Sequence, residues 1–294
     1  MKTAVNGLAR QVAHVLLLAL LVLVLGMLPV AVHAAAAAMV IDLQGKAAVT
    51  DAGRTRDATI LSELEAGAQV QLQAGATLVV MYLDSGDEYV FKGPASIVFR
   101  PTEPEMLSGP RPDKRSPSVG KGIRIKPVGM VQGAIVLRSL LPGARIRLLT
   151  LSGTRVLENP PEFRWQELQP GLKYQFGISD DTGRSLHEAT VEGSSFTLPP
   201  GVQLSDGASY QWEVSTRLPD GRKYSNVGVF SIASVELRAL AAGLRTEGSA
   251  PVSARVTYAA WLDQMELKDE ARRYWRTLST ERPDDARLRL LAQQ

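Results

Sequence analysis

Residues 43–98 constrain the fold most, because they form short runs of alternating apolar and polar residues that end at glycine-bearing turns. Residues 69–74 alternate glutamine with apolar residues, which predicts a strand with one apolar face. Residues 78–83 are continuously apolar, long enough for a strand buried on both faces. Turn residues follow at 84–86 and again at 93–94. This spacing predicts a compact all-β domain.

Four motifs in this stretch resemble the FecR-like periplasmic domain: GKAAV at 45–49, LEAGAQV at 64–70, DSG at 84–86 and GPAS at 93–96. They are mostly turn glycines and alternating residues, so they specify a fold rather than an activity. The resemblance implies a role in envelope signalling or assembly through protein–protein contact. FecR proteins carry a cytoplasmic sigma-regulating segment, whereas residues 1–14 are too few for a folded domain, so we do not expect sigma-factor regulation. The alternative is an unrelated small β-sandwich with the same turns.

The N-terminus has the pattern of a secretory signal peptide, which we assign to residues 1–38. Lys2 and Arg10 precede an apolar run, and small residues favour cleavage between Ala34 and Ala38. The alternative is an uncleaved anchor in the inner membrane, because residues 15–41 are long and apolar enough to span a bilayer. In either case we expect the remainder to be exported to the periplasm.

The residue types present exclude several kinds of site. The chain has no cysteine and only three histidines, so disulfides, thiolate metal sites and multi-histidine zinc sites lack their residues. The net charge of +3 is small, which argues against a nucleic-acid partner. Acidic residues cluster at 84–88 and 180–181, where turn formation explains them better than paired catalytic acids or calcium binding do. We therefore expect a non-enzyme without cofactor or metal.

From residue 100 the composition changes to prolines and basic residues, which predicts a linker at about 100–122 within a first domain of 39–128. The alternative is a cationic strip that contacts anionic lipid or glycan. Ile123, Ile125 and Val128 alternate, as in a last strand of that domain.

Residues 129–233 show strand patterns at sandwich spacing and resemble a fibronectin type III-like module. The resemblance rests on Phe163-Arg164-Trp165, on the L-x-x-G-x-x-Y-x-W-x-V run at 204–214 and on residues 229–232. It implies that Leu204 and Tyr210 anchor a crossover corner. We expect Trp165 and Trp212 to lie in the core rather than stack on a sugar.

From residue 234 the apolar period becomes helical, first over residues 235–244. Residues 253–283 then resemble a single tetratricopeptide repeat, through Ala271, Trp275 and Pro283. Arg255 stands where that repeat carries an aromatic residue. One repeat needs neighbours to cover its apolar face. The hairpin therefore either docks on the sandwich or binds another protein.

The expected fold is mainly β: a FecR-like domain, a fibronectin-like sandwich and a small α-helical tail at 234–294. We expect a non-enzymatic, exported sensing or scaffold protein that contacts an envelope protein. The candidate contact residues are Tyr258, Leu262, Arg272 and Tyr274. The alternative is a protein that binds peptidoglycan or another cell-wall polysaccharide through the basic strip and the amide side chains of Gln69, Gln71 and Gln73.

Overall fold

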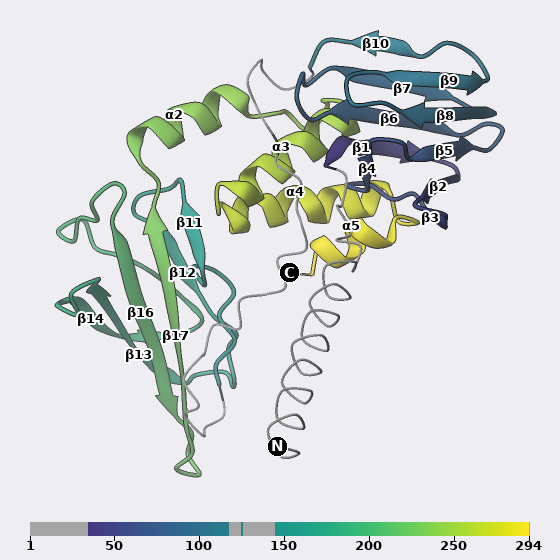
Figure 1. Cartoon of the computed structure of the whole chain (residues 1–294). Helices are drawn as coiled ribbons and strands as arrows, with labels where there is room; N and C mark the ends of the chain where they lie inside the picture. The colour runs from purple at the N-terminus through teal and green to yellow at the C-terminus, as the bar shows by residue number, and fades with distance from the viewer. Residues whose placement is uncertain (1–34, 118–124, 126–144, 294) are drawn as a thin grey trace, which may run out of the picture. The chain divides into compact units, whose positions relative to one another are not determined.

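The computed structural model describes residues 35–117, 125 and 145–293. Residues 36–294 form one unit, and its described part is mainly β with helices towards the C-terminus, as expected (Figure 1). Ile123 and Val128 of the predicted last strand lie outside the described residues, as does the apolar run at 135–137, whose sequence also predicts a strand.

Two five-stranded antiparallel sheets build the first β domain. Sheet A has the order β10-β7-β6-β1-β4, with β1 at Ala36–Gln44, β4 at Glu63–Glu65, β6 at Thr77–Tyr82, β7 at Glu88–Lys92 and β10 at Asp113–Arg115. Sheet B has the order β3-β2-β5-β8-β9, with β2 at Ala47–Asp51, β3 at Arg54–Asp57, β5 at Gln69–Leu72, β8 at Ala95–Phe99 and β9 at Pro104–Ser108. The apolar residues of sheet B alternate towards a core shared with sheet A.

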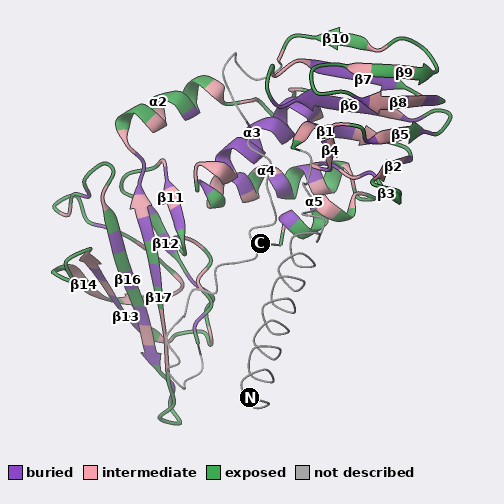
Figure 2. Cartoon of the chain, viewed as in Figure 1, coloured by how far each residue is buried: buried purple, intermediate pink, exposed green. Residues whose placement is uncertain are grey.

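Strand β6 is buried on both faces, as its continuous apolar sequence predicts (Figure 2). Leu78, Val80 and Tyr82 belong to the core between the two sheets. Val79 and Met81 point to the opposite face and belong to a second core with the C-terminal helices. Sheet A is therefore the middle layer between sheet B and the helices.

The expectation that prolines keep residues 100–122 free of regular structure is wrong for part of this segment. Pro104 opens β9, which pairs with β8, and β10 pairs with β7. Both strands lie at sheet edges, and Pro104 is the first residue of its strand. Proline is tolerated at such positions, because the open side of an edge strand has no neighbouring strand to which a backbone N–H must donate.

A sandwich follows, with a sheet of order β11-β17-β16-β13-β14 and a two-stranded sheet β12-β15. Its strands are β11 at Thr154–Val156, β12 at Glu162–Arg164, β13 at Lys173–Asp180, β14 at Ser185–Glu192, β15 at Ser195–Thr197, β16 at Ser209–Arg217 and β17 at Lys223–Ile232. Trp165 and Trp212 are each 1% exposed, which confirms their expected place in the core. The apolar residues at 146–149 also predict a strand, but this segment forms only an isolated bridge from Leu148 to Trp165.

Two tyrosine hydroxyls fix the corners of this sandwich. The backbone N–H of Ser205 donates to the Tyr210 hydroxyl at 2.7 Å, so Tyr210 anchors its corner as expected. The N–H of Leu168 donates in the same way to the Tyr174 hydroxyl at 2.9 Å. A hydroxyl that bonds the backbone a few residues upstream is typical of corners in immunoglobulin-like sandwiches.

The helices are α2 at Val235–Leu244, α3 at Val252–Gln264, α4 at Lys268–Glu281 and α5 at Ala286–Leu291. Every residue from Ser253 to Leu262 in α3 is buried, whereas Ala241 is the one buried residue of α2 (Figure 2). Ser234 caps the N-terminus of α2, because its hydroxyl accepts the N–H of Leu237 at 3.2 Å. The hairpin α3–α4 is thus an interior element, and α2 lies at the surface.

The hairpin packs on the first β domain, and not on the face of the sandwich. Met39 and Met81 of sheet A share one core with Val256 and Leu278 of the helices. Polar contacts reinforce this packing: Arg282 pairs with Asp42 at 3.3 Å, and Asp285 accepts the N–H of Ile60 at 2.9 Å. The apolar face that the sequence left open for another protein is covered within the chain.

The turn between α3 and α4 binds the sandwich through hydrogen bonds alongside β11. The N–H of Arg155 donates to the Glu266 carbonyl at 2.7 Å, and the N–H of Lys268 donates to the Thr154 hydroxyl at 3.1 Å. Asp269 accepts the N–H of Leu151 at 3.0 Å. The helical segment therefore contacts both β domains.

Candidate partner-binding groove

Two of the four predicted contact residues lie in the interior. Tyr258 is 3% exposed and Leu262 is fully buried, so neither offers a surface to a partner. The Tyr258 hydroxyl donates to the Ala241 carbonyl at 3.0 Å and thereby holds α2 on α3. Helical periodicity identified their apolar face correctly but could not show that the chain itself covers it.

The other two predicted contact residues lie on α4 and are partly exposed. Arg272 donates to Asp269 at 2.8 Å, close to the contact with the sandwich. The Tyr274 ring packs edge-on against Tyr258, with 5.1 Å between ring centroids, and its hydroxyl donates to the Thr246 carbonyl at 3.0 Å. Tyr274 therefore connects α4 to the segment that follows α2.

A groove lies between α4 and the C-terminal end of α2, and we call it the α2–α4 groove. Its volume is about 740 Å³. Its lining residues are Ala242, Arg245, Thr246, Glu247, Gly248, Arg255, Arg273, Tyr274, Thr277 and Leu278. Of the predicted contact residues, only Tyr274 is among them.

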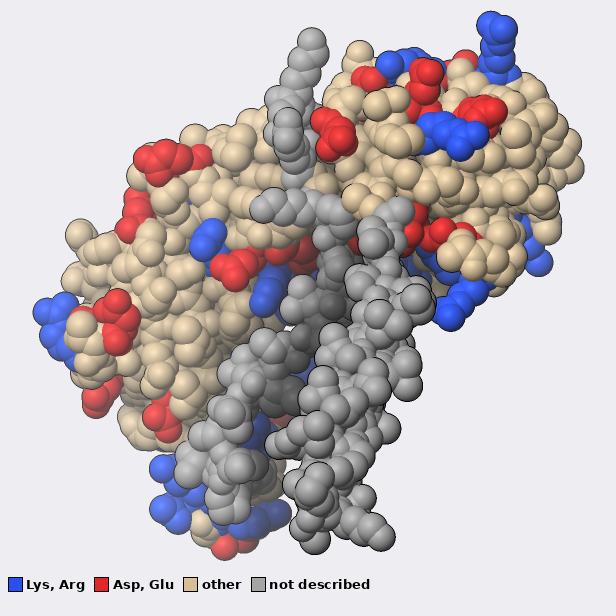
Figure 3. Space-filling view, in the orientation of Figure 1, with Lys and Arg blue, Asp and Glu red and all other residues tan. Residues whose placement is uncertain are grey.

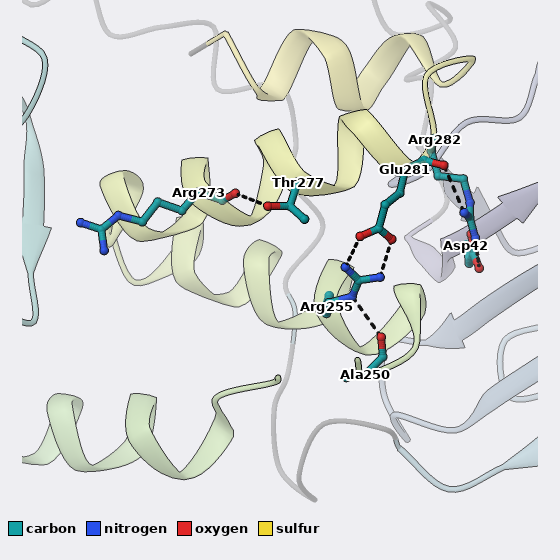
Figure 4. A network of polar contacts seen from close by, with 7 residues as sticks. All are labelled: Asp42, Ala250, Arg255, Arg273, Thr277, Glu281 and Arg282. Carbon is teal, nitrogen blue, oxygen red and sulfur yellow. Dashed lines mark hydrogen bonds and ion pairs between the residues drawn. The ribbon is translucent and has the colours of Figure 1, made fainter. Parts of the chain in front are cut away.

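Three arginines line the α2–α4 groove, and one of them is already neutralised. Arg255 is buried and forms two hydrogen bonds with Glu281, at 2.6 and 2.5 Å, while its Nε donates to the Ala250 carbonyl at 3.0 Å (Figure 4). Arg245 and Arg273 are exposed, and within the described residues neither forms an ion pair. Figure 4 shows the Arg273 guanidinium directed away from the Arg255–Glu281 pair.

A smaller cavity of about 340 Å³ adjoins the groove and shares Ala242, Arg245, Arg273 and Tyr274 with it. It also contains Glu270, whose Oε2 atom is buried without a hydrogen-bond partner. Burial raises the pKa of Glu270 to about 7, although the nearby Arg273 acts in the opposite direction. Sequence reasoning missed this carboxyl, because a glutamate in the first turn of α4 reads as a favourable helix start.

The predicted amide face lies on β5 and beyond its end. Gln71 and Gln73 are exposed, whereas Gln69 is half-buried and donates to the Ser96 hydroxyl at 3.0 Å. Thr50 and Thr55 hydrogen-bond each other beside this row. The face is polar and presents amides and hydroxyls, as predicted from the alternation.

The predicted basic strip is only partly described. Lys114 pairs with Asp87 at 2.7 Å and lies 5.6 Å from the centre of the Tyr89 ring. The hydrogen bond to Asp87 raises the pKa of Lys114. Lys121, Arg124 and Lys126 lie outside the described residues. Figure 3 also shows basic side chains at the sandwich end where β16 turns into β17, the turn that carries Arg217, Arg222 and Lys223.

Residues 35–117, 125 and 145–293 contain no group of three or more histidine, cysteine, aspartate or glutamate side chains placed to hold a metal ion. No helix in these ranges is both long and apolar enough to cross a membrane.

No known family model matches the chain, and no curated protein does. Solved structures that resemble it include CopC from Methylosinus trichosporium OB3b, at 18% identity over 31% of this chain and 96% of that one, with a TM-score of 0.25. A two-domain fibronectin type III segment of chicken tenascin is 13% identical over 63% of this chain and 82% of that one, with a TM-score of 0.22. A cytokine receptor complex is 12% identical over 66% of this chain and 95% of that one, also with a TM-score of 0.22. Likenesses this weak carry no inference about function.

Proposed function

We propose that this chain is an exported, non-enzymatic scaffold protein of the cell envelope that acts through protein–protein contact. The observation that carries the proposal is the α2–α4 groove, which lies on the helical segment that contacts both β domains. A partner bound in the groove would be held by a helical segment that is itself packed on the first β domain and hydrogen-bonded to the sandwich. The proposal includes the periplasm as location and the removal of the N-terminal signal peptide.

The family relationships remain part of this proposal. The four motifs in residues 43–98 support a FecR-like first domain, since they fall at turns and strands of the two sheets. A tetratricopeptide-like hairpin is supported by Ala271 and Trp275, which are both buried in its core, and by Pro283 just after the end of α4. A sensing or signalling role would follow from the FecR-like relationship.

In-cell photo-crosslinking tests the scaffold proposal. A photoreactive residue replaces Thr277, which is exposed and lines the α2–α4 groove. We expect one dominant protein adduct that mass spectrometry can identify. A second chain carries the photoreactive residue at Gln73, on the amide face. If neither position gives a protein adduct, and the photoreactive chain is instead crosslinked to the cell-wall fraction, the proposal is wrong.

The second candidate function is binding of a cell-wall glycan, and the exposed amides of Gln71 and Gln73 favour it. Amide and hydroxyl groups on an open polar face suit the hydroxyl and acetamido groups of such a polymer. Binding of the purified protein to insoluble peptidoglycan tests it, with a Gln71→Ala/Gln73→Ala double variant as comparison. Both side chains are exposed, so the variant should fold normally. Equal sedimentation of the two proteins would contradict glycan binding through this face.

A further inference from the structure

We infer that the α2–α4 groove binds an acidic peptide segment of a partner protein. This inference rests on the proposed scaffold function and adds the chemistry of the partner.

The charge of the groove favours an anionic ligand. Arg245 and Arg273 contribute two positive charges that no ion pair within the described residues neutralises, whereas Arg255 is paired with Glu281. Glu247 is the one acidic residue that lines the groove. The groove proper therefore has an excess of positive charge. Guanidinium groups bind carboxylates with paired hydrogen bonds, so Asp or Glu side chains are fitting ligands.

The lining and size of the groove favour a peptide over a small free anion. Its volume of about 740 Å³ has room for several side chains. Ala242, which is exposed, and the half-buried Tyr274 provide apolar surface beside the two arginines. A ligand that combines carboxylates with apolar groups would use both kinds of surface, as a peptide segment does.

A polar atom in the wall supports a ligand with hydrogen-bonding groups. Thr246 lines the groove, and its hydroxyl is buried without a hydrogen-bond partner. An unpartnered buried hydroxyl costs free energy unless a partner is supplied. A bound peptide offers backbone carbonyls and carboxylates as hydrogen-bond acceptors for this hydroxyl.

Peptide binding to the purified full-length protein tests the inference. The probe is a pool of fluorescein-labelled ten-residue peptides in which Asp or Glu alternates with apolar residues. A matched pool has Asn and Gln in place of the acids. We expect the acidic pool to bind at least about tenfold more tightly, and its affinity to fall as salt is added. Equal affinity for both pools would overturn the inference.

Two charge reversals on the same helix separate the groove from general electrostatics. Arg273 lines the groove, whereas Arg276, three residues further along α4, is exposed and does not. We expect Arg273→Glu to weaken acidic-pool binding about tenfold and Arg276→Glu to change it less than about twofold. Arg273→Gln, which removes charge without reversing it, should give an intermediate loss. Equal effects at both positions would show that the groove is not the binding site.

The two proposals fail in different ways. If the Thr277 crosslinker captures a protein whose crosslinked segment has no acidic residue, the scaffold function stands and the acidic-peptide inference is wrong. If neither photoreactive position captures a protein, the scaffold function is wrong and the inference falls with it.

Discussion

Arg255 of α3 and Glu281, the last residue of α4, form a two-pronged ion pair with N–O distances of 2.6 and 2.5 Å. The Arg255 side chain is only 7% exposed, and that of Glu281 is 36% exposed. The proposed tetratricopeptide-like relationship of this hairpin would place an aromatic residue at position 255. Here an ion pair instead connects the start of one helix to the end of the next.

Substitution of Glu281 should lower the free energy of unfolding more than substitution of Arg255 does. Glu281→Ala leaves the guanidinium of Arg255 buried without its countercharge, so we expect a loss of about 3 kcal/mol in the free energy of unfolding. Arg255→Met leaves Glu281, whose carboxylate reaches water, and fills the space of the arginine with an apolar side chain. For this variant we expect the free energy of unfolding to fall by only about 1 kcal/mol. Urea unfolding of both variants measures the difference. Equal losses would show that the burial of Arg255 does not govern the cost.

The corner tyrosines predict a second pair of variants. Tyr174→Phe and Tyr210→Phe each remove one hydroxyl that accepts a backbone N–H, at 2.9 and 2.7 Å. We expect each to lower the free energy of unfolding by about 1 kcal/mol. Tyr224→Phe is the control, because the described contacts of its ring involve Arg222 and no hydroxyl bond. An unchanged unfolding midpoint for Tyr210→Phe would contradict the role assigned to this corner.

The residue spacing of a tyrosine corner occurs twice in the sequence. The spacing L-x-x-G-x-x-Y that predicted the corner at Leu204 and Tyr210 occurs also from Leu168 to Tyr174. Both glycines, Gly171 and Gly207, have positive φ, at 78° and 75°. Local turn chemistry of this kind is readable from sequence, because it depends on residues within one short segment.

The place of the helices could not be read from sequence in the same way. The apolar run of β6 shows that something covers its second face. Helix α3 mixes apolar residues with Ser253, Arg255 and Thr257, so its sequence does not show that all of these residues are buried. Neither pattern names the partner, because periodicity reports only that a face is buried. Tyr258 and Leu262 were therefore predicted as contacts, although they lie in the core. Arg245 and Arg273 face one groove only because α2 and α4 meet in the fold.

Removal of the helices should damage the first β domain. A chain that ends at residue 234 exposes the helix-facing side of sheet A, including Met39, Val79 and Met81. We expect this variant to bind an apolar dye such as ANS and to aggregate, because a large apolar face meets water. The full-length chain should bind little dye. A monomeric, dye-silent truncation would show that sheet A does not need this cover.

If the N-terminus is removed as a signal peptide, as proposed above, the position of β1 predicts the point of cleavage. β1 begins at Ala36, and Ala38 is fully buried and pairs with Leu64 and Tyr82. Cleavage after Ala38 would delete the start of a strand in sheet A, whereas cleavage after Ala34 leaves it whole. We therefore expect a mature N-terminus at Ala35. Intact mass of the exported protein decides between the two, and a mature chain that starts at Met39 would contradict this placement.

Glu270 should make the stability of the protein depend on pH. Burial raises its pKa to about 7 from the model-compound value of 4.5, so the folded state holds a proton that the unfolded state releases between these values. The free energy of unfolding is therefore not reduced by Glu270 below about pH 4.5, and it decreases as the pH rises from there to about 7. At pH 8 the folded protein bears the full cost of the buried charge, on the order of 3 kcal/mol.

Glu270→Gln should remove this cost, because glutamine stays neutral. We expect the variant to be more stable than the natural chain at pH 8, by about 1 to 2 kcal/mol after the loss of carboxylate interactions with Arg273. At pH 4.5 the two should differ little. Urea unfolding at both pH values measures this, with Glu247→Gln as the control, since its carboxylate is exposed. A constant difference across the two pH values would contradict the raised pKa of Glu270.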